Sequence, residues 1–108
     1  KNDEIYINLM HQKLEICVLS NGEFIFYNLF ETKTKEDFLF YILYTLNQLN
    51  ISPNTVSLNA FGDLLTSPDY YETLKKYVRN ISFNEDDKQL GHYFTLYKLF
   101  ECELFQEH

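Results

Sequence analysis

The first third of the chain contains three consecutive runs of strand-forming residues with only short turns between them. The runs cover residues 5–10, 13–19 and 23–30. The first two alternate at the period of a half-buried strand, and the third is rich in β-branched and aromatic residues. Asn21-Gly22 between the second and third runs is a strong hairpin signal, because both residues tolerate positive φ. These runs predict a three-stranded antiparallel meander.

The pattern then changes to alternating helices and strands. Thr34 followed by Asp37 matches a capping box, and it predicts a helix that ends at Asn50. Ser67-Pro68 predicts the cap and first position of a second helix, with Tyr77 on its inner face. The remaining predicted elements are strands at residues 55–61 and 81–83 and a third helix at about residues 92–105.

The predicted element order is therefore βββαβαβα. Right-handed crossovers would make each strand reached through a helix parallel to the first strand. The expected fold is an α/β, ribonuclease-H-like domain: a mixed five-stranded sheet, with strands one to three antiparallel and helices packed on it. This sheet is also the core of actin-like ATPase domains, and residues 1–108 are expected to form one such domain.

Two segments resemble a known bacterial family. The first is residues 24–55, with Asn-Leu-Phe at 28–30 and Lys-Glu-Asp-Phe at 35–38, and the second is residues 60–77, with a glycine after the fourth strand. They are similar to a family common in the Bacteroidetes, domain of unknown function 3822. Its members look like degenerate actin-like ATPases built from two halves. The resemblance implies that this chain is one half, the C-terminal one, of a longer two-domain protein, and it implies no activity.

The likeness to actin-like ATPases directs attention to the first hairpin. Those proteins hold phosphates at an Asp-x-Gly turn between the first two strands, where the acid positions magnesium-bound water. The matching positions here are Asn8 and Met10, which supply neither the charge nor the close backbone approach. A residual ATP site would involve Asn8, His11, Gly62 and Asp63, although a strand-to-helix turn is the favoured role for Gly62.

A metal-dependent nuclease is a more remote alternative. It needs several converging carboxylates, the first from the centre of strand one, and that strand has none between residues 5 and 10. Glu15 and Asp63 are the candidate pair for such a site, but a solvated strand face is the expected position of Glu15. No metal-ligand spacing and no cofactor motif is present, so neither a metal nor a cofactor is expected.

Charge and cysteine content narrow the function classes further. The net charge of −7 disfavours binding to nucleic acid and to anionic membranes. No apolar run is long enough to span a bilayer. Cys17 and Cys102 are expected to be reduced core residues of a cytoplasmic protein, with a disulfide as the alternative.

The aromatic content carries the remaining signal. The chain has 10 Phe and 9 Tyr, more large rings than one small sheet can cover. Aromatic residues are enriched in interface cores. The candidate interface residues are Phe40, Tyr44, Phe94, Tyr97 and Phe105. The preferred interpretation is a non-catalytic interaction or scaffold domain that packs against its sister half or forms a homodimer.

Overall fold

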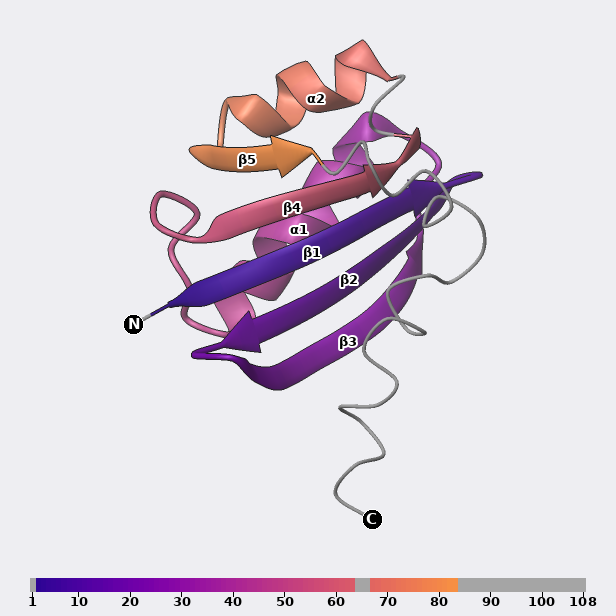
Figure 1. Cartoon of the computed structure of the whole chain (residues 1–108). Helices are drawn as coiled ribbons and strands as arrows, with labels where there is room; N and C mark the ends of the chain where they lie inside the picture. The colour runs from indigo at the N-terminus through magenta and orange to yellow at the C-terminus, as the bar shows by residue number, and fades with distance from the viewer. Residues whose placement is uncertain (1, 64–66, 84–108) are drawn as a thin grey trace.

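The structure is a computed structural model that describes residues 2–63 and 67–83. These residues form one mixed sheet of order β3-β2-β1-β4-β5 with two helices (Figure 1). The elements in chain order are β1 (Asp3–Met10), β2 (Lys13–Ser20), β3 (Glu23–Glu31), α1 (Lys35–Gln48), β4 (Ser57–Gly62), α2 (Pro68–Lys75) and β5 (Asn80–Phe83).

The strand directions confirm the predicted topology. β1, β2 and β3 form antiparallel pairs, whereas β4 is parallel to β1 and β5 is parallel to β4. The observed order βββαβαβ matches the prediction up to β5. The predicted helix at 92–105 lies outside the described residues.

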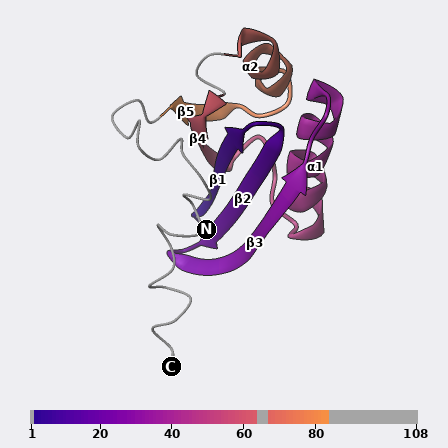
Figure 2. The same ribbon diagram turned by 90° about the vertical axis from the view of Figure 1, so that its right-hand side faces the viewer.

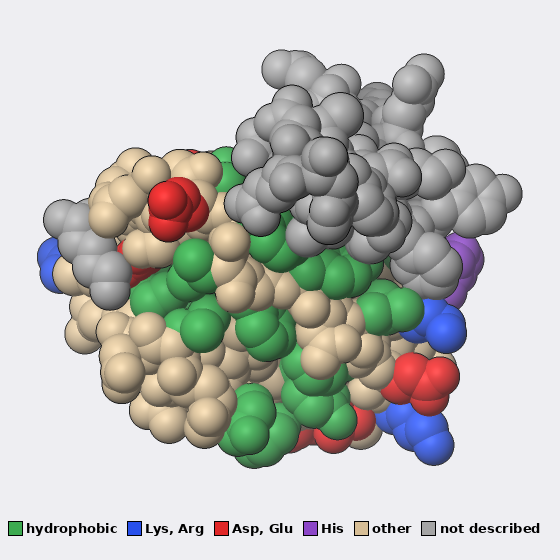
Figure 3. Space-filling model, turned by 90° about the horizontal axis from the view of Figure 1, so that it is seen from below, with side chains coloured by type: hydrophobic (Ala, Val, Ile, Leu, Met, Phe, Trp, Pro, Cys, Tyr) green, Lys and Arg blue, Asp and Glu red, His purple; other side chains and the backbone are tan. Residues whose placement is uncertain are grey.

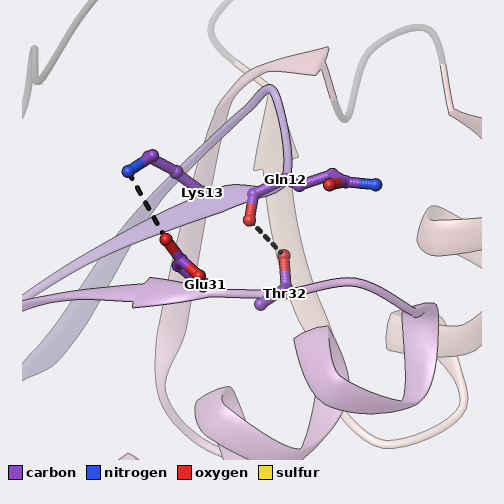
Figure 4. Close-up of polar contacts among 4 residues, drawn as sticks. All are labelled: Gln12, Lys13, Glu31 and Thr32. Carbon is purple, nitrogen blue, oxygen red and sulfur yellow. Dashed lines mark hydrogen bonds and ion pairs between the residues drawn. The ribbon is translucent and has the colours of Figure 1, made fainter.

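Both hairpins of the meander use two residues with positive φ. Asn21 and Gly22 have φ of 52° and 81°, as the Asn-Gly signal predicts. His11 and Gln12 adopt the same conformation, with φ of 49° and 66°, without a glycine. Figure 4 shows how this first turn is fixed: the Gln12 carbonyl accepts a hydrogen bond from the Thr32 hydroxyl at 3.2 Å, beside the Lys13–Glu31 ion pair at 3.7 Å.

β3 forms one edge of the sheet, and it is irregular there. The register against β2 shifts between Val18 and Leu19, which leaves Ile25 as an extra residue, 41% exposed. Further along, the Leu29 N–H donates to the side-chain oxygen of Asn28 at 2.8 Å. Figure 3 views the molecule from the side where β3 lies and shows hydrophobic side chains across this face.

α1 begins and ends with the signals read from its sequence. The Thr34 side chain accepts from the Asp37 N–H at 3.1 Å, and the Asp37 carboxylate accepts from the Thr34 N–H at 3.3 Å. At the other end Asn50 has φ of 57°, and the Ile51 N–H reaches the Leu46 carbonyl at 2.9 Å. This is a Schellman ending. Both helix boundaries therefore follow from local chemistry.

Both helices cover the same face of the sheet, as Figure 2 shows. This follows from two right-handed crossovers that move in the same direction across the sheet, from β3 to β4 and then from β4 to β5. The main core lies between the sheet and these helices, and its most buried large side chains include Phe38, Ile5, Ile7, Leu14, Ile16, Ile42, Leu46, Leu58 and Leu74.

Two details of the second helix differ from the prediction. Ser67 occupies the cap position, but its side chain makes no capping hydrogen bond. α2 ends at Lys75, so Tyr77 lies beyond the helix and is 50% exposed instead of facing the core. The chain turns there through Tyr77 and Val78 N–H bonds to the Leu74 carbonyl, and Val78 is the residue that enters the core.

Candidate functional site

The four residues considered for a residual nucleotide site meet at the carboxyl ends of β1 and β4. The parallel register places Asn8 beside Phe61 and Leu9 beside Gly62. Asp63 follows β4 directly, and His11 opens the turn after β1. In α/β sheets, ligands commonly bind at the carboxyl ends of parallel strands. The location is therefore the one at which a ligand site would be expected.

Gly62 has a structural reason to be glycine. Its φ is +77°, in the left-handed region. A Cβ built there would lie 2.5 Å from Asn8 Oδ1 and closer still to the backbone oxygen of Leu9. The residue is thus required for the close approach of β4 to the end of β1.

Asp63 occupies the position that an anion would need at the first hairpin. Its Oδ2 accepts a hydrogen bond from the His11 backbone N–H at 3.2 Å, across 52 residues of sequence. Backbone N–H groups in such turns are the donors that bind phosphate oxygens in nucleotide-binding proteins. Here a carboxylate of the same chain already takes one of them, and its negative charge repels a phosphate.

A buried polar network lies behind this turn. Glu15 is 1% exposed and accepts hydrogen bonds from the Tyr27 hydroxyl at 2.5 Å and from Asn8 Nδ2 at 3.2 Å. The expectation that Glu15 lies on a solvated strand face is therefore wrong. Residues 14–19 of β2 are all buried, so both faces of this strand are covered and its outward carboxylate needs partners within the protein.

The sequence offered only a weak signal for this network. Cys17, Leu19 and Phe61 form a second small core on that face, packed with Tyr6, Phe24 and Tyr27. Polar and apolar residues alternate along β1 and β2, and this alternation is typical of strands with one buried and one solvent-exposed face. Glu15 lies between Leu14 and Ile16, and the next residue on its own face is Cys17. Together with Tyr27 on the next strand, this apolar setting was the hint of burial.

Cys17 is a free, buried thiol, as the sequence predicts. Burial raises the pKa of Cys17 from 9.0 to about 12, and the charge of Glu15 adds to the shift. The pKa of Tyr6 also rises to about 12, first through burial and then through its hydrogen bond to Glu4. Because both groups are held neutral in the folded state, their stabilising contribution is complete below pH 9 and is lost as the pH rises toward 12.

The thiol is expected to be unreactive while the protein is folded. In a Cys102→Ser background, Cys17 should react with a disulfide reagent at about pH 8 only as fast as the protein unfolds, because the thiolate is the attacking species. The measurement is the rate of thiol release, with the chain in concentrated guanidinium chloride as the fully reactive control. Stoichiometric reaction within the mixing time under native conditions would contradict the burial of this side chain.

The nuclease alternative gains no support from the geometry. Glu15 is engaged by Tyr27 and Asn8, whereas Asp63 contacts the His11 N–H. Within residues 2–63 and 67–83, no three His, Cys, Asp or Glu side chains come together as metal ligands. Neither helix in this part of the chain has the length and apolar character to cross a bilayer.

A second feature is an apolar patch on α1. Phe40 and Tyr44 are 58% and 49% exposed, and their rings stack with centroids 5.6 Å apart. They line an open groove of about 420 Å³ together with Glu36, Leu39, Leu43 and Tyr77. We call this set the α1 groove. The sequence pointed to Phe40 and Tyr44 but placed Tyr77 in the core, and Phe94, Tyr97 and Phe105 lie outside the described residues.

Comparison with solved structures supports the fold. The chain is similar to a protein from Bacteroides thetaiotaomicron VPI-5482 described as having an actin-like ATPase fold and unknown function, with a TM-score of 0.76 and 21% identity. The match covers 94% of this chain but only 38% of that one. At this identity the likeness shows the fold alone, which is the predicted actin-like, ribonuclease-H-like sheet.

Comparison at the level of sequence gives the family. None of the curated proteins matches this chain. Residues 1–81 match the family described as a protein of unknown function, DUF3822. That match spans the meander, both described helices, β4 and the first half of β5, and it includes the residues that carry the resemblance. The chain therefore belongs to the DUF3822 family.

Proposed function

We propose that this chain is a non-catalytic protein-interaction domain that keeps an actin-like ATPase fold without its nucleotide chemistry. The observation that carries the proposal is the contact between Asp63 and the His11 N–H at 3.2 Å. A phosphate group at this turn would have to displace a carboxylate that is part of the protein itself. Both groups are negative, so the carboxylate also lowers the local affinity for any free anion.

The shape of the hairpin supports the same proposal. A two-residue turn of His11 and Gln12 leaves no glycine-rich loop to surround a phosphate. The turn is also tied to the end of β3, because the Thr32 N–H and hydroxyl both donate to the Gln12 carbonyl. Opening it for a ligand would break these bonds. Asn8, at the position of the acid that would orient magnesium-bound water, is neutral and bonded to Glu15.

The interaction role is supported by the α1 groove. Exposed clusters of large apolar side chains on a small soluble domain commonly mark a site of protein association. The chain spans 38% of the solved protein that shares its fold, so it fits one half of a longer, two-domain protein. The sister half and a second copy are accordingly the two partners that the proposal names.

Titration with magnesium and ATP tests the non-catalytic part of the proposal. Calorimetry on the folded chain should give no saturable heat at nucleotide concentrations up to about 1 mM, since the turn offers no free anion site. The Asp63→Asn variant is the matched comparison: it removes the repelling charge and keeps the side-chain size. Saturable binding of ATP by the unmodified chain in the micromolar range would overturn the proposal.

A further inference from the structure

The turn between β2 and β3 contains a chemically reactive pair of residues. Asn21 is the one asparagine of the chain that is followed by glycine. The side-chain amide of asparagine is thermolabile, and the group that attacks it is the backbone nitrogen of the next residue. Glycine leaves that nitrogen unshielded because it has no Cβ. Both residues of the turn are exposed, and even a Cβ built on Gly22 would meet no atom within 4 Å.

We infer that Asn21 is a site of spontaneous deamidation that the folded hairpin suppresses. In this reaction the Gly22 nitrogen attacks Cγ of Asn21 and forms a new C–N bond. The Cγ–Nδ2 bond breaks, and Nδ2 leaves as ammonia with the proton that Gly22 gave up. The resulting succinimide ring is then opened by water to aspartate or isoaspartate. This modification goes beyond the proposed interaction function and does not depend on it.

The backbone conformation of Asn21 opposes closure of the succinimide ring. Its φ of 52° lies in the left-handed region, where ψ is about +30 to +60°. At such a ψ the Gly22 nitrogen and the Asn21 Cβ point to nearly opposite sides of the Cα–C bond. The ring needs both on the same side, so this bond has to rotate by about half a turn. That rotation would break the two-residue loop that joins the paired residues Ser20 and Glu23.

Asn2, just before β1, holds Asn21 in place with two hydrogen bonds. The Asn21 N–H donates to the Asn2 carbonyl at 2.7 Å, and the Asn2 N–H donates to Asn21 Oδ1 at 2.9 Å. The second bond fixes the side chain whose Cγ has to reach Gly22. Each bond should make the open turn about fivefold rarer, so the two together should slow the reaction about thirtyfold.

The two products have different effects on the hairpin. Aspartate at position 21 keeps an oxygen that accepts from the Asn2 N–H, so the turn re-forms with one more negative charge. Isoaspartate carries an extra methylene in the main chain, and a two-residue loop then no longer matches the ends of the two strands. Chains that form isoaspartate after this end of the sheet opens are therefore unable to return to the native hairpin.

The experiment incubates the 108-residue chain in a mildly alkaline buffer, once folded and once in concentrated guanidinium chloride. Peptide mapping against synthetic standards measures the conversion of Asn21 to aspartate and isoaspartate over time. The folded chain is expected to convert at least about thirtyfold more slowly than the unfolded chain. Asn50 is the internal control: its φ of 57° is also left-handed, but Ile51 shields the next nitrogen, so Asn50 should persist in both samples.

Asn2→Pro tests the contribution of Asn2, because it removes the N–H donor and keeps the carbonyl. The folded variant should convert about fivefold faster than the parent chain, and the two should convert equally fast in guanidinium chloride. Far-ultraviolet circular dichroism shows whether the variant is folded, and the comparison of folded and unfolded parent chain needs no variant. Three results would overturn the inference: equal rates in the folded and unfolded parent, no conversion of Asn21 in the unfolded parent, or a folded Asn2→Pro variant that converts no faster than the parent.

Discussion

Replacing Gly62 with alanine is expected to lower the free energy of unfolding by about 3 kcal/mol. The positive φ of +77° accounts for roughly 1 kcal/mol of this, and the rest comes from overlap of the new Cβ with the Leu9 carbonyl and Asn8 Oδ1. The carbonyl belongs to the central strand of the sheet and cannot move without disturbing the pairing of β1 and β4. Urea unfolding monitored by circular dichroism gives the value.

Gly22 provides the control for this prediction. Its φ of +81° is almost the same, but a Cβ there meets no atom within 4 Å. Gly22→Ala should therefore lower the free energy of unfolding only by the cost of placing alanine at a positive φ, about 1 kcal/mol. Equal losses for the two variants would show that a Cβ at position 62 meets no costly steric overlap with β1.

Replacing Glu15 with alanine is also expected to have a large effect, lowering the free energy of unfolding by about 3 kcal/mol. The change removes the acceptor for the Tyr27 hydroxyl and for Asn8 Nδ2 in a site that is 1% exposed. Each donor that loses its buried acceptor costs about 1–3 kcal/mol, and the lost side-chain volume adds a cavity term. Unfolding in urea at neutral pH measures the loss.

Two conservative variants separate these contributions. Glu15→Gln keeps the volume and one acceptor oxygen, so it should cost less than Glu15→Ala. Tyr27→Phe removes only the hydroxyl, and the double variant Glu15→Ala/Tyr27→Phe should be less destabilised than the sum of its parts, because the two groups share one hydrogen bond. Additive losses would mean that this bond contributes no coupling energy.

The features that the sequence predicted well are those determined by residues close together along the chain. Asn21-Gly22 and the Thr34–Asp37 capping box depend only on the conformation of a few adjacent residues, and both form as expected. The helices that precede β4 and β5 then predicted the parallel direction of these two strands, because parallel strands are usually joined by a helical crossover. Family membership was also accessible from the sequence, because the resembling segments contain these same local signals.

The features that could not be predicted depend on distant parts of the chain. Burial of Glu15 depends on which side chains cover the outer face of β2. Its hydrogen-bond partner Tyr27 comes from β3. Tyr27 lies diagonally across from Glu15, because the residue directly opposite Glu15 in the sheet is Leu29. The contact of Asp63 with His11 requires the parallel register of β1 and β4. Tyr77 was misplaced because α2 stops after Lys75, a boundary that the helical spacing alone does not show.

The irregular edge strand β3 has a consequence for solubility. The Thr32 N–H points toward β2, so by alternation the Leu29 N–H points to the open edge. An incoming strand would need the Leu29 N–H as a hydrogen-bond donor, but this N–H already donates to the Asn28 side chain. At the other end of β3, the extra residue Ile25 interrupts the regular pattern of backbone hydrogen bonds. Both irregularities make this nine-residue edge strand a poor template for pairing with an incoming strand. We therefore expect that the chain can expose apolar side chains on β3 without pairing to a second chain through this edge.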